Sequence, residues 1–336
     1  MRRRSLYPFF PCFLVAILAC GERPLVTPNG AWQKQGTVLV GSVDHEYSVQ
    51  EPSVLYEDGI FEMWFTCGWN IEGMCYATST DGLHWTRFNS GLPLIQNVAH
   101  GFVTKIGSMY YYYAAILPQS KMFGRWYSTD KVTWVQDASG MLPSTSKGWE
   151  ASQRGNIYVW PTDSKWYALY EALGDDSVWR IGIATSSDGL NWVKSDTNPK
   201  IILGSHGACG GPEVHLISGL YYIWVHCSHN RLFPTEMYRF HSSDLNAFTL
   251  DPSFTVMGRT TLDEGMNKND GQVADPSMVE VDGRTYMYYD ATDTQDPTAD
   301  GGIHLKLAVA DMTLEKLVTT EEGTKDKNTI DLSVAK

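Results

Sequence analysis

The sequence repeats one pattern of about fifty residues five times, and this repeat limits the folds open to the chain more than any other feature. Each copy opens with a short strand-like run, passes through a turn that contains Gly, Asp or Ser, and continues with an aromatic-rich run. The spacings between successive starts are 49, 56, 55 and 64 residues. The five starts, called ring residues below, are Glu51, His100, Asn156, Gly211 and Asp275.

Each copy also closes in a similar way, with an Asp that an aromatic residue follows four positions later in four of the five copies. Asp81 with Trp85 and Asp188 with Trp192 are the clearest examples. We expect a structural role, in which the Asp caps a turn and the Trp packs between neighbouring units. The pattern also resembles the Asp box of sialidases, but it is one residue shorter and recurs five rather than six times. A sialidase is therefore a distant alternative.

Short strands joined by such turns, at about fifty residues per copy, predict four-stranded antiparallel blades. Five of them give an all-β chain, a five-bladed β-propeller over residues 31–316 in which residues 31–41 add a strand that closes the ring. A parallel β-solenoid is disfavoured because its repeats are much shorter. The polar stretch 317–336 is expected to be a C-terminal appendage. Because a closed propeller leaves no edge to pair, we expect a monomer.

Residues 1–20 are interpreted as an export signal. Three arginines precede an apolar stretch from Leu6 to Leu18, which is too short to span a bilayer comfortably. The run Ile-Leu-Ala-Cys-Gly at 17–21 is typical of a bacterial lipobox, in which Cys20 carries a lipid after cleavage. We therefore expect an outer-membrane or cell-surface lipoprotein, with a periplasmic or secreted protein as the alternative.

Export permits disulfide bonds among the four cysteines that follow the signal. Cys67 and Cys75 flank one hairpin turn, and Cys209 and Cys227 lie symmetrically about another. However, Cys67 and Cys227 also occupy the same position in their copies, so the pairing is left open. No Cys-x-x-Cys motif or His pairing accompanies them, and the histidines of the fourth copy match no standard zinc motif. We assign no metal site.

Composition excludes some partners and favours others. The formal net charge of −12 argues against nucleic acid and against binding to an anionic membrane surface. The 12 Trp, 18 Tyr and 12 Phe residues suit half-buried strands, and they can also supply stacking faces for sugar rings.

The ring residues are expected to converge on a pocket, because the inner strands of a propeller surround its axis. Two of them, Glu51 and Asp275, are carboxylates, and each is followed by Pro-Ser. Hydrolysis of a glycosidic bond needs one carboxylic acid to protonate the leaving oxygen and a second carboxylate to activate water or attack carbon. Converging carboxylates also raise one another's pKa values, as an acid catalyst requires.

Five copies, the Glu-Pro-Ser-Val and Asp-Pro-Ser-Met starts and the Ala-Thr-Ser-x-Asp-Gly-x-x-Trp closings resemble the arabinanase/levansucrase/invertase superfamily, which includes glycoside hydrolase families 43 and 32. The resemblance covers nearly all of residues 45–312. It implies a base or nucleophile at Glu51, where the superfamily typically has Asp. It places the acid at a Glu immediately before Gly-Pro, but this chain has Gly210 before Gly211-Pro212.

Two other glutamates are candidates for that acid. Glu213 lies two residues after Gly211, so strand alternation places it on the same face as the ring residue. Glu150 precedes the third inner strand, on a loop expected beside the pocket. The structural alternatives are an ordinary blade residue for Glu213 and a solvated loop residue for Glu150.

Four further residues are candidates for contacts with the sugar: His100, Arg154, Trp69 and Trp149. His100 could instead help to hold a central cation, since some relatives bind calcium in the central channel. The Trp residues could serve as stacking platforms, although packing is the commoner role of a buried Trp. No other cofactor is expected.

The sequence therefore predicts a glycosidase that cleaves an oligosaccharide with paired carboxylates. The missing Glu of the fourth copy supports an alternative, a saccharide-binding lipoprotein without turnover. A glycoside phosphorylase is a further alternative, but it needs a cationic phosphate site, for which Arg154 is the sole candidate near the pocket.

Overall fold

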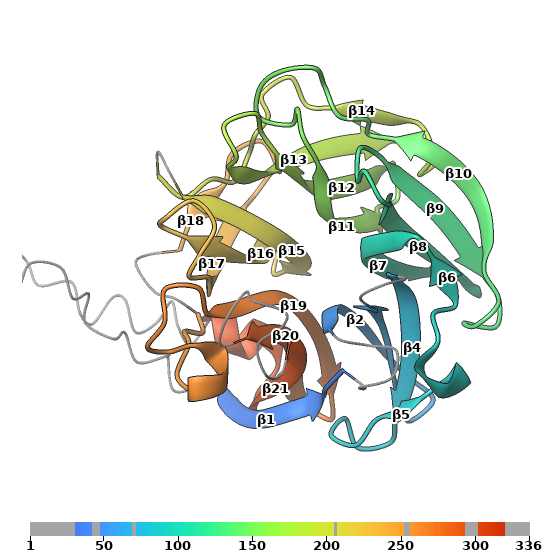
Figure 1. The fold of residues 1–336 in the computed structure, drawn as a ribbon, viewed down its shortest axis with the longest axis vertical. Helices are drawn as coiled ribbons and strands as arrows, with labels where there is room; N and C mark the ends of the chain where they lie inside the picture. Colours follow the sequence, from blue (N-terminus) through green and yellow to red (C-terminus); the bar gives the residue numbers. More distant parts are fainter. Residues whose placement is uncertain are drawn as a thin grey trace, which may run out of the picture.

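The computed structural model describes residues 31–41, 48–68, 72–204, 207–251, 256–292 and 302–319. These residues form five antiparallel sheets that surround one central axis, as Figure 1 shows. The chain is a five-bladed β-propeller, and the expected fold class is confirmed.

The blades follow one another along the chain, with the innermost strand first in each. Blade 1 contains β2 (Val49–Glu57), β3 (Ile60–Cys67), β4 (Gly73–Ser79) and β5 (Thr86–Arg87), with β6 (Ile95–Gln96) also paired to β4. Blade 2 contains β7 (Val98–Ile106), β8 (Met109–Ile116), β9 (Phe123–Ser128) and β10 (Val135–Met141). Blade 3 contains β11 (Arg154–Pro161), β12 (Trp166–Leu173), β13 (Trp179–Ser186) and β14 (Trp192–Lys194). Blade 4 contains β15 (Ala208–Ile217), β16 (Leu220–Ser228), β17 (Glu236–Ser242) and β18 (Thr249–Leu250). Blade 5 contains β19 (Gln272–Val281), β20 (Arg284–Thr292), β21 (His304–Ala310) and β1 (Gln33–Leu39).

The first strand of the chain completes the last blade. Strand β1 pairs antiparallel with β21, so the extra strand predicted at residues 31–41 does close the ring (Figure 1). Lys34 on β1 is held at the ring closure by Glu264, whose Oε2 lies 2.6 Å from Lys34 Nζ. Glu264 belongs to the 3₁₀ helix η2 (Leu262–Glu264) and is completely buried. The remaining 3₁₀ helix, η1, spans Asn89–Gly91 in blade 1.

The recurrent Asp turns join neighbouring blades. Asp81 Oδ1 accepts two backbone N–H groups of its own turn at 2.8 Å. The carbonyl of Gly82 accepts the hydroxyl of Tyr288 from blade 5 at 2.9 Å, and the ring of Trp85 packs 5.4 Å from the same Tyr288. The structural role expected for this motif is therefore confirmed in blade 1.

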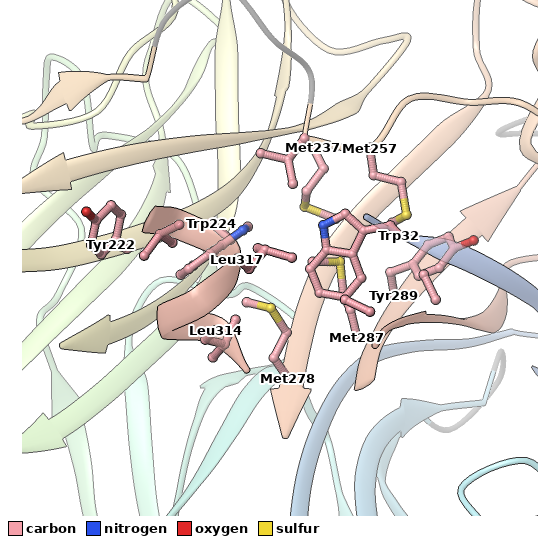
Figure 2. Close-up of a cluster of buried hydrophobic side chains, with 14 of the residues drawn as sticks. Trp32, Tyr222, Trp224, Met237, Met257, Met278, Met287, Tyr289, Leu314 and Leu317 are labelled. Atoms are coloured by element: carbon pink, nitrogen blue, oxygen red, sulfur yellow. The ribbon is translucent and has the colours of Figure 1, made fainter. Parts of the chain in front are cut away.

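A large hydrophobic cluster fills the contact between blades 4 and 5. Figure 2 shows its Met, Trp and Tyr side chains, including Trp32 from the segment before β1. Leu317 and Val318 in the short helix 314–319 are fully buried in the same cluster. The first two residues beyond the expected boundary at 316 thus belong to the core.

Both disulfide bonds among the described residues join neighbouring strands of a hairpin. Cys67 pairs with Cys75 and Cys209 with Cys227, at Cα–Cα distances of 5.8 and 4.1 Å. The pairing left open from the sequence is thus the local one, and it is consistent with an exported protein. The expected export signal and Cys20 lie outside the described residues, as does most of the 317–336 segment. Among the described helices, none has the length and apolar character to cross a membrane.

Candidate active site

Each innermost strand carries a β-bulge at the same place, and these bulges form the wall of the central pocket. At each bulge the pairing with the second strand skips two residues. The skipped pairs are Glu51-Pro52, His100-Gly101, Gly155-Asn156, Gly211-Pro212 and Asp275-Pro276. A bulge re-aims the side chain that it carries, which explains why the ring residues face the axis.

Four of the five ring residues have a left-handed backbone. The φ angles are 57° at Glu51, 60° at His100, 55° at Gly211 and 48° at Asp275. Such a conformation costs about 1–3 kcal/mol for a residue other than glycine, and strained residues of this kind gather at functional sites. The strain at two carboxylates and a histidine around one axis therefore marks a candidate active site.

The pocket that the ring residues line has a volume of about 190 Å³. Its polar lining contains ring residues and residues of the second strands, and other lining residues are apolar. The polar lining residues include Glu51, His100, Asn156, Glu171, His226, Gln272, Asp275 and Asp290. The apolar ones include Trp179, Leu232, Phe233 and Ile303.

Glu51 is held by its neighbour in the ring. Its Oε2 accepts the backbone N–H of His100 at 2.7 Å, and its Oε1 contacts Nδ1 of the same His100. Burial alone would lower the pKa of His100, but the charge of Glu51, helped by Glu171 and Asp275, raises that pKa to about 9. His100 and Glu51 therefore form an ion pair at neutral pH.

Asp275 is held by partners from two other blades. Its Oδ1 lies 3.1 Å from Nδ1 of His226 on β16 and accepts the Asn156 amide at 2.6 Å. Burial would raise the pKa of Asp275, but the His226 charge outweighs it and keeps that pKa below the ordinary value. The pKa of His226 is raised, because the charge of Asp275 outweighs the effect of burial. Asp275 is therefore an ionised carboxylate.

Glu171 and Asp290 are acidic residues of the pocket that we did not predict. Burial raises the pKa of Glu171, and the charge of Asp275 adds to this effect. Burial also raises the pKa of Asp290 well above its ordinary value, again with the charge of Asp275 as the next cause. The pocket thus contains an ionised carboxylate, Asp275, together with two carboxyl groups, Glu171 and Asp290, whose raised pKa values favour the protonated form.

Glu213 lies outside the pocket lining, contrary to the expectation from strand alternation. The bulge at Gly211-Pro212 adds a residue between the ring position and Glu213, so the alternation no longer applies. Glu213 instead accepts the backbone N–H of Met278 in the next blade at 2.8 and 3.0 Å, and its Oε1 lies 2.8 Å from Nε2 of His215. It joins blades 4 and 5.

Glu150, Arg154 and Trp149 form a second group away from the pocket lining. Glu150 is 6% exposed and bonds Arg154 at 3.1 Å and Lys194 at 2.8 Å. Arg154 is fully buried and also donates to the carbonyl oxygens of Leu142 and Pro143. Trp149 packs with its ring centroid 5.7 Å from that of Tyr170. This group stabilises the loop before blade 3.

Two expectations from the sequence are not tested by the described residues. Trp69 lies outside them. For the central cation, no group of three or more His, Cys, Asp and Glu side chains within the described ranges is arranged to hold a metal ion. A calcium ion in the channel stays a prediction.

Comparison with known proteins supports the fold. No protein-family model matches the sequence, and no curated protein sequence does. A protein solved in a complex with RGII has a TM-score of 0.65 at 13% identity, covering 82% of this chain and 92% of its own length. A thermostable family-43 glycoside hydrolase gives 0.60 at 13% identity, covering 81% and 91%.

A third structure comes from the family of mannoside phosphorylases that contains glycoside hydrolases targeting β-1,2 mannosidic linkages in Candida mannan. Its TM-score is 0.58 at 14% identity, covering 84% of this chain and 95% of its own length. The fold is that of the five-bladed propeller glycoside hydrolases. The resemblance found in the sequence is confirmed at the level of the fold.

Proposed function

We propose that the protein is a glycosidase that cleaves a glycosidic bond of an oligosaccharide in the central pocket. The observation that carries this proposal is the pairing, in one pocket, of an ionised Asp275 with a Glu171 whose pKa is raised. Glycoside hydrolysis needs such a pair, because one group must give a proton while the other must accept one or attack carbon. The glycoside hydrolases among the structural neighbours support the same function.

Two adjacent glycines indicate how close the two carboxyl groups lie. A Cβ on Gly210 would lie 2.4 Å from Oε1 of Glu171, and a Cβ on Gly211 would lie 2.1 Å from Oδ1 of Asp275. Both carboxyl groups therefore approach the same corner of blade 4. In the proposed reaction Glu171 protonates the leaving oxygen, and Asp275 activates water or attacks the anomeric carbon. Glu51 completes the negative wall of the pocket.

The lining favours one sugar residue without an anionic group. At about 190 Å³ the pocket is smaller than a typical ligand site of about 300–1,000 Å³, which suits a single terminal sugar. No Lys or Arg is among its lining residues, and the internal segments between the described ranges contain neither residue type. The two lining histidines already pair with Glu51 and Asp275. A carboxylated, sulfated or phosphorylated sugar would lack a cationic partner.

The lack of Lys and Arg among the lining residues of the pocket also weakens the phosphorylase and sialidase alternatives. Arg154, the sole candidate for a phosphate site, donates to Glu150 and to backbone carbonyl oxygens within blade 3. A saccharide-binding protein without turnover has more support. His100 engages both oxygens of Glu51, and Gly210 occupies the position where the superfamily resemblance expects the acid.

Product release from a panel of neutral oligosaccharides and aryl glycosides tests the proposal. Wild type would be compared with Glu51→Gln and Asp275→Asn, and with Asp311→Asn as a control at an exposed ion pair with Arg284. Turnover that both pocket variants lose and Asp311→Asn keeps would support the glycosidase. Turnover that survives both changes would reject these site residues. Absence of turnover, with a sugar still raising the melting temperature, would favour the binding protein.

A further inference from the structure

Asp290 lies beside two ring residues, Glu51 and Asp275, and contacts both of them. It is on β20, opposite Ala274, and is 1% exposed. Its Oδ1 accepts the backbone N–H of Glu51 at 2.7 Å, and its carboxyl group shares a hydrogen bond with the carboxyl group of Asp275. One buried side chain thus links the ring residue of blade 5 to that of blade 1.

Residues at the same register position support the ring in two other blades. Thr66 in blade 1 and His226 in blade 4 stand where Asp290 stands in blade 5. Thr66 Oγ1 accepts the backbone N–H of His100 at 3.3 Å, and His226 Nδ1 lies 3.1 Å from Asp275 Oδ1. In each case a second-strand residue of one blade holds the ring residue of the next.

The fold itself does not require a polar group at this position. Blades 2 and 3 have Ala115 and Ala172 there. A buried carboxyl group lowers stability unless it is hydrogen-bonded or paired. The presence of Asp290 is therefore best explained by what it contacts.

The bond between Asp290 and Asp275 needs a proton, since two ionised carboxylates repel each other. Asp275 has His226 and Asn156 as partners for its negative charge. Within the described part of the chain, the partners of Asp290 are the Glu51 N–H and the Asp275 carboxyl group, and burial raises its pKa well above the ordinary value. Asp290 therefore carries the shared proton, and it donates to Asp275 while it accepts from Glu51.

We propose that Asp290 is a positioning residue that fixes Glu51 and Asp275 relative to each other. One contact holds the left-handed backbone at Glu51, and the other holds the carboxylate of Asp275 through a shared proton. The inference rests on the proposed function, which gives Glu51 and Asp275 their importance. The positioning of Glu51 by Asp290 can nevertheless be tested without measuring turnover.

The test uses the imidazole of His100 as a reporter of where Glu51 lies. The pKa of His100 is about 9 because of the charge of Glu51 and its neighbours. NMR titration of the His100 ring would be compared in wild type, Asp290→Ala and Asp290→Asn. Asparagine is the neutral mimic, because its oxygen can accept the Glu51 N–H and its amide can donate to Asp275.

We expect Asp290→Ala to lower the pKa of His100 toward its ordinary value and Asp290→Asn to leave it near 9. Asp251→Asn is the control for a buried carboxylate elsewhere, because Asp251 pairs with Arg239 and His241 in blade 4. It should leave the pKa of His100 unchanged. We expect Asp290→Ala to fold, because alanine already occupies this register position in blades 2 and 3. If it does not fold, Asp290→Ser is the second variant.

The inference is overturned if the first foldable variant keeps the wild-type pKa of His100, or if Asp290→Asn lowers it equally. Turnover would be measured in parallel. For an active enzyme we expect Asp290→Ala to lose about a hundredfold in kcat, as misplaced reacting groups do, and Asp290→Asn to lose less than about threefold. A wild type without turnover would reject the proposed function, while the comparison of His100 pKa values would still decide the role of Asp290.

Discussion

Gly211 leaves space for the carboxylate of Asp275. A Cβ atom on Gly211 would lie 2.1 Å from Oδ1 of Asp275 and 2.8 Å from Nδ1 of His226. Gly211 also has a φ of 55°, which favours glycine for a second reason. Because Gly211 in blade 4 has no side chain, the carboxylate of Asp275 in blade 5 can lie where it does in the pocket.

We predict that Gly211→Ala displaces Asp275 and lowers sugar binding or turnover by about a hundredfold. Gly219→Ala is the matched control, because Gly219 has a φ of 85° in the same blade with nothing within 4 Å of its added Cβ. Both variants should lose about 1–2 kcal/mol of stability from backbone strain in urea unfolding. Equal activity in the two variants would show that the Gly211 contact does not matter.

The His100–Glu51 pair should make stability depend on pH. The pKa of His100 is raised from 6.5 to about 9 in the folded protein. A group with a raised folded pKa stabilises fully below its unfolded pKa, and this contribution is lost as the pH rises through the folded value. The melting temperatures of wild type and His100→Gln should therefore differ most below pH 6.5 and converge above about pH 9. A gap that stays constant or widens in alkali would contradict the ion pair.

Removal of the Cys209–Cys227 disulfide should affect both stability and the site. The bond closes an 18-residue separation, and loop-closure entropy gives a loss of about 3 kcal/mol for the double Cys→Ser variant. Removal of the Cys67–Cys75 disulfide, which spans a separation of 8, should lower the free energy of unfolding by about 2.5 kcal/mol for the same reason. Cys209 adjoins Gly210 and Cys227 adjoins His226, which lies 3.1 Å from Asp275. Cys67 adjoins Thr66, which makes a longer contact of 3.3 Å with the backbone N–H of His100. We therefore expect the first variant to weaken sugar binding more than the second when both are folded. Calorimetry with and without sugar separates the two effects.

The sequence predicted the ring in register in four of the five blades, because the repeat sets the register of the inner strands. In blade 3 the bulge begins one residue before the predicted Asn156, at Gly155. The sequence located Glu51, His100, Asn156 and Asp275 at the axis, and all four line the pocket. It also predicted the closing strand at residues 31–41. These features depend on position along the chain, and the repeat shows that position directly.

The second-strand residues could not be placed in the same way. Glu171, His226 and Asp290 reach the pocket from strands whose pairing with the inner strand is changed by a bulge. A single acid in each apolar run, Leu-Tyr-Glu-Ala and Tyr-Tyr-Asp-Ala, was the available signal. The bulge in β15 also explains why strand alternation predicted Glu213 on the pocket face, whereas it lies outside the pocket lining.

The measurement that tests the central claim most directly is the dependence of Glu171→Gln activity on the leaving group. Removal of a general acid typically costs about 10²–10⁴-fold, and the loss is greatest where the leaving oxygen needs a proton. We predict a loss of this size on an oligosaccharide and little loss on an aryl glycoside with an acidic phenol as leaving group. An equal loss on both substrates, or none on the oligosaccharide, would contradict the assignment of Glu171 as the acid.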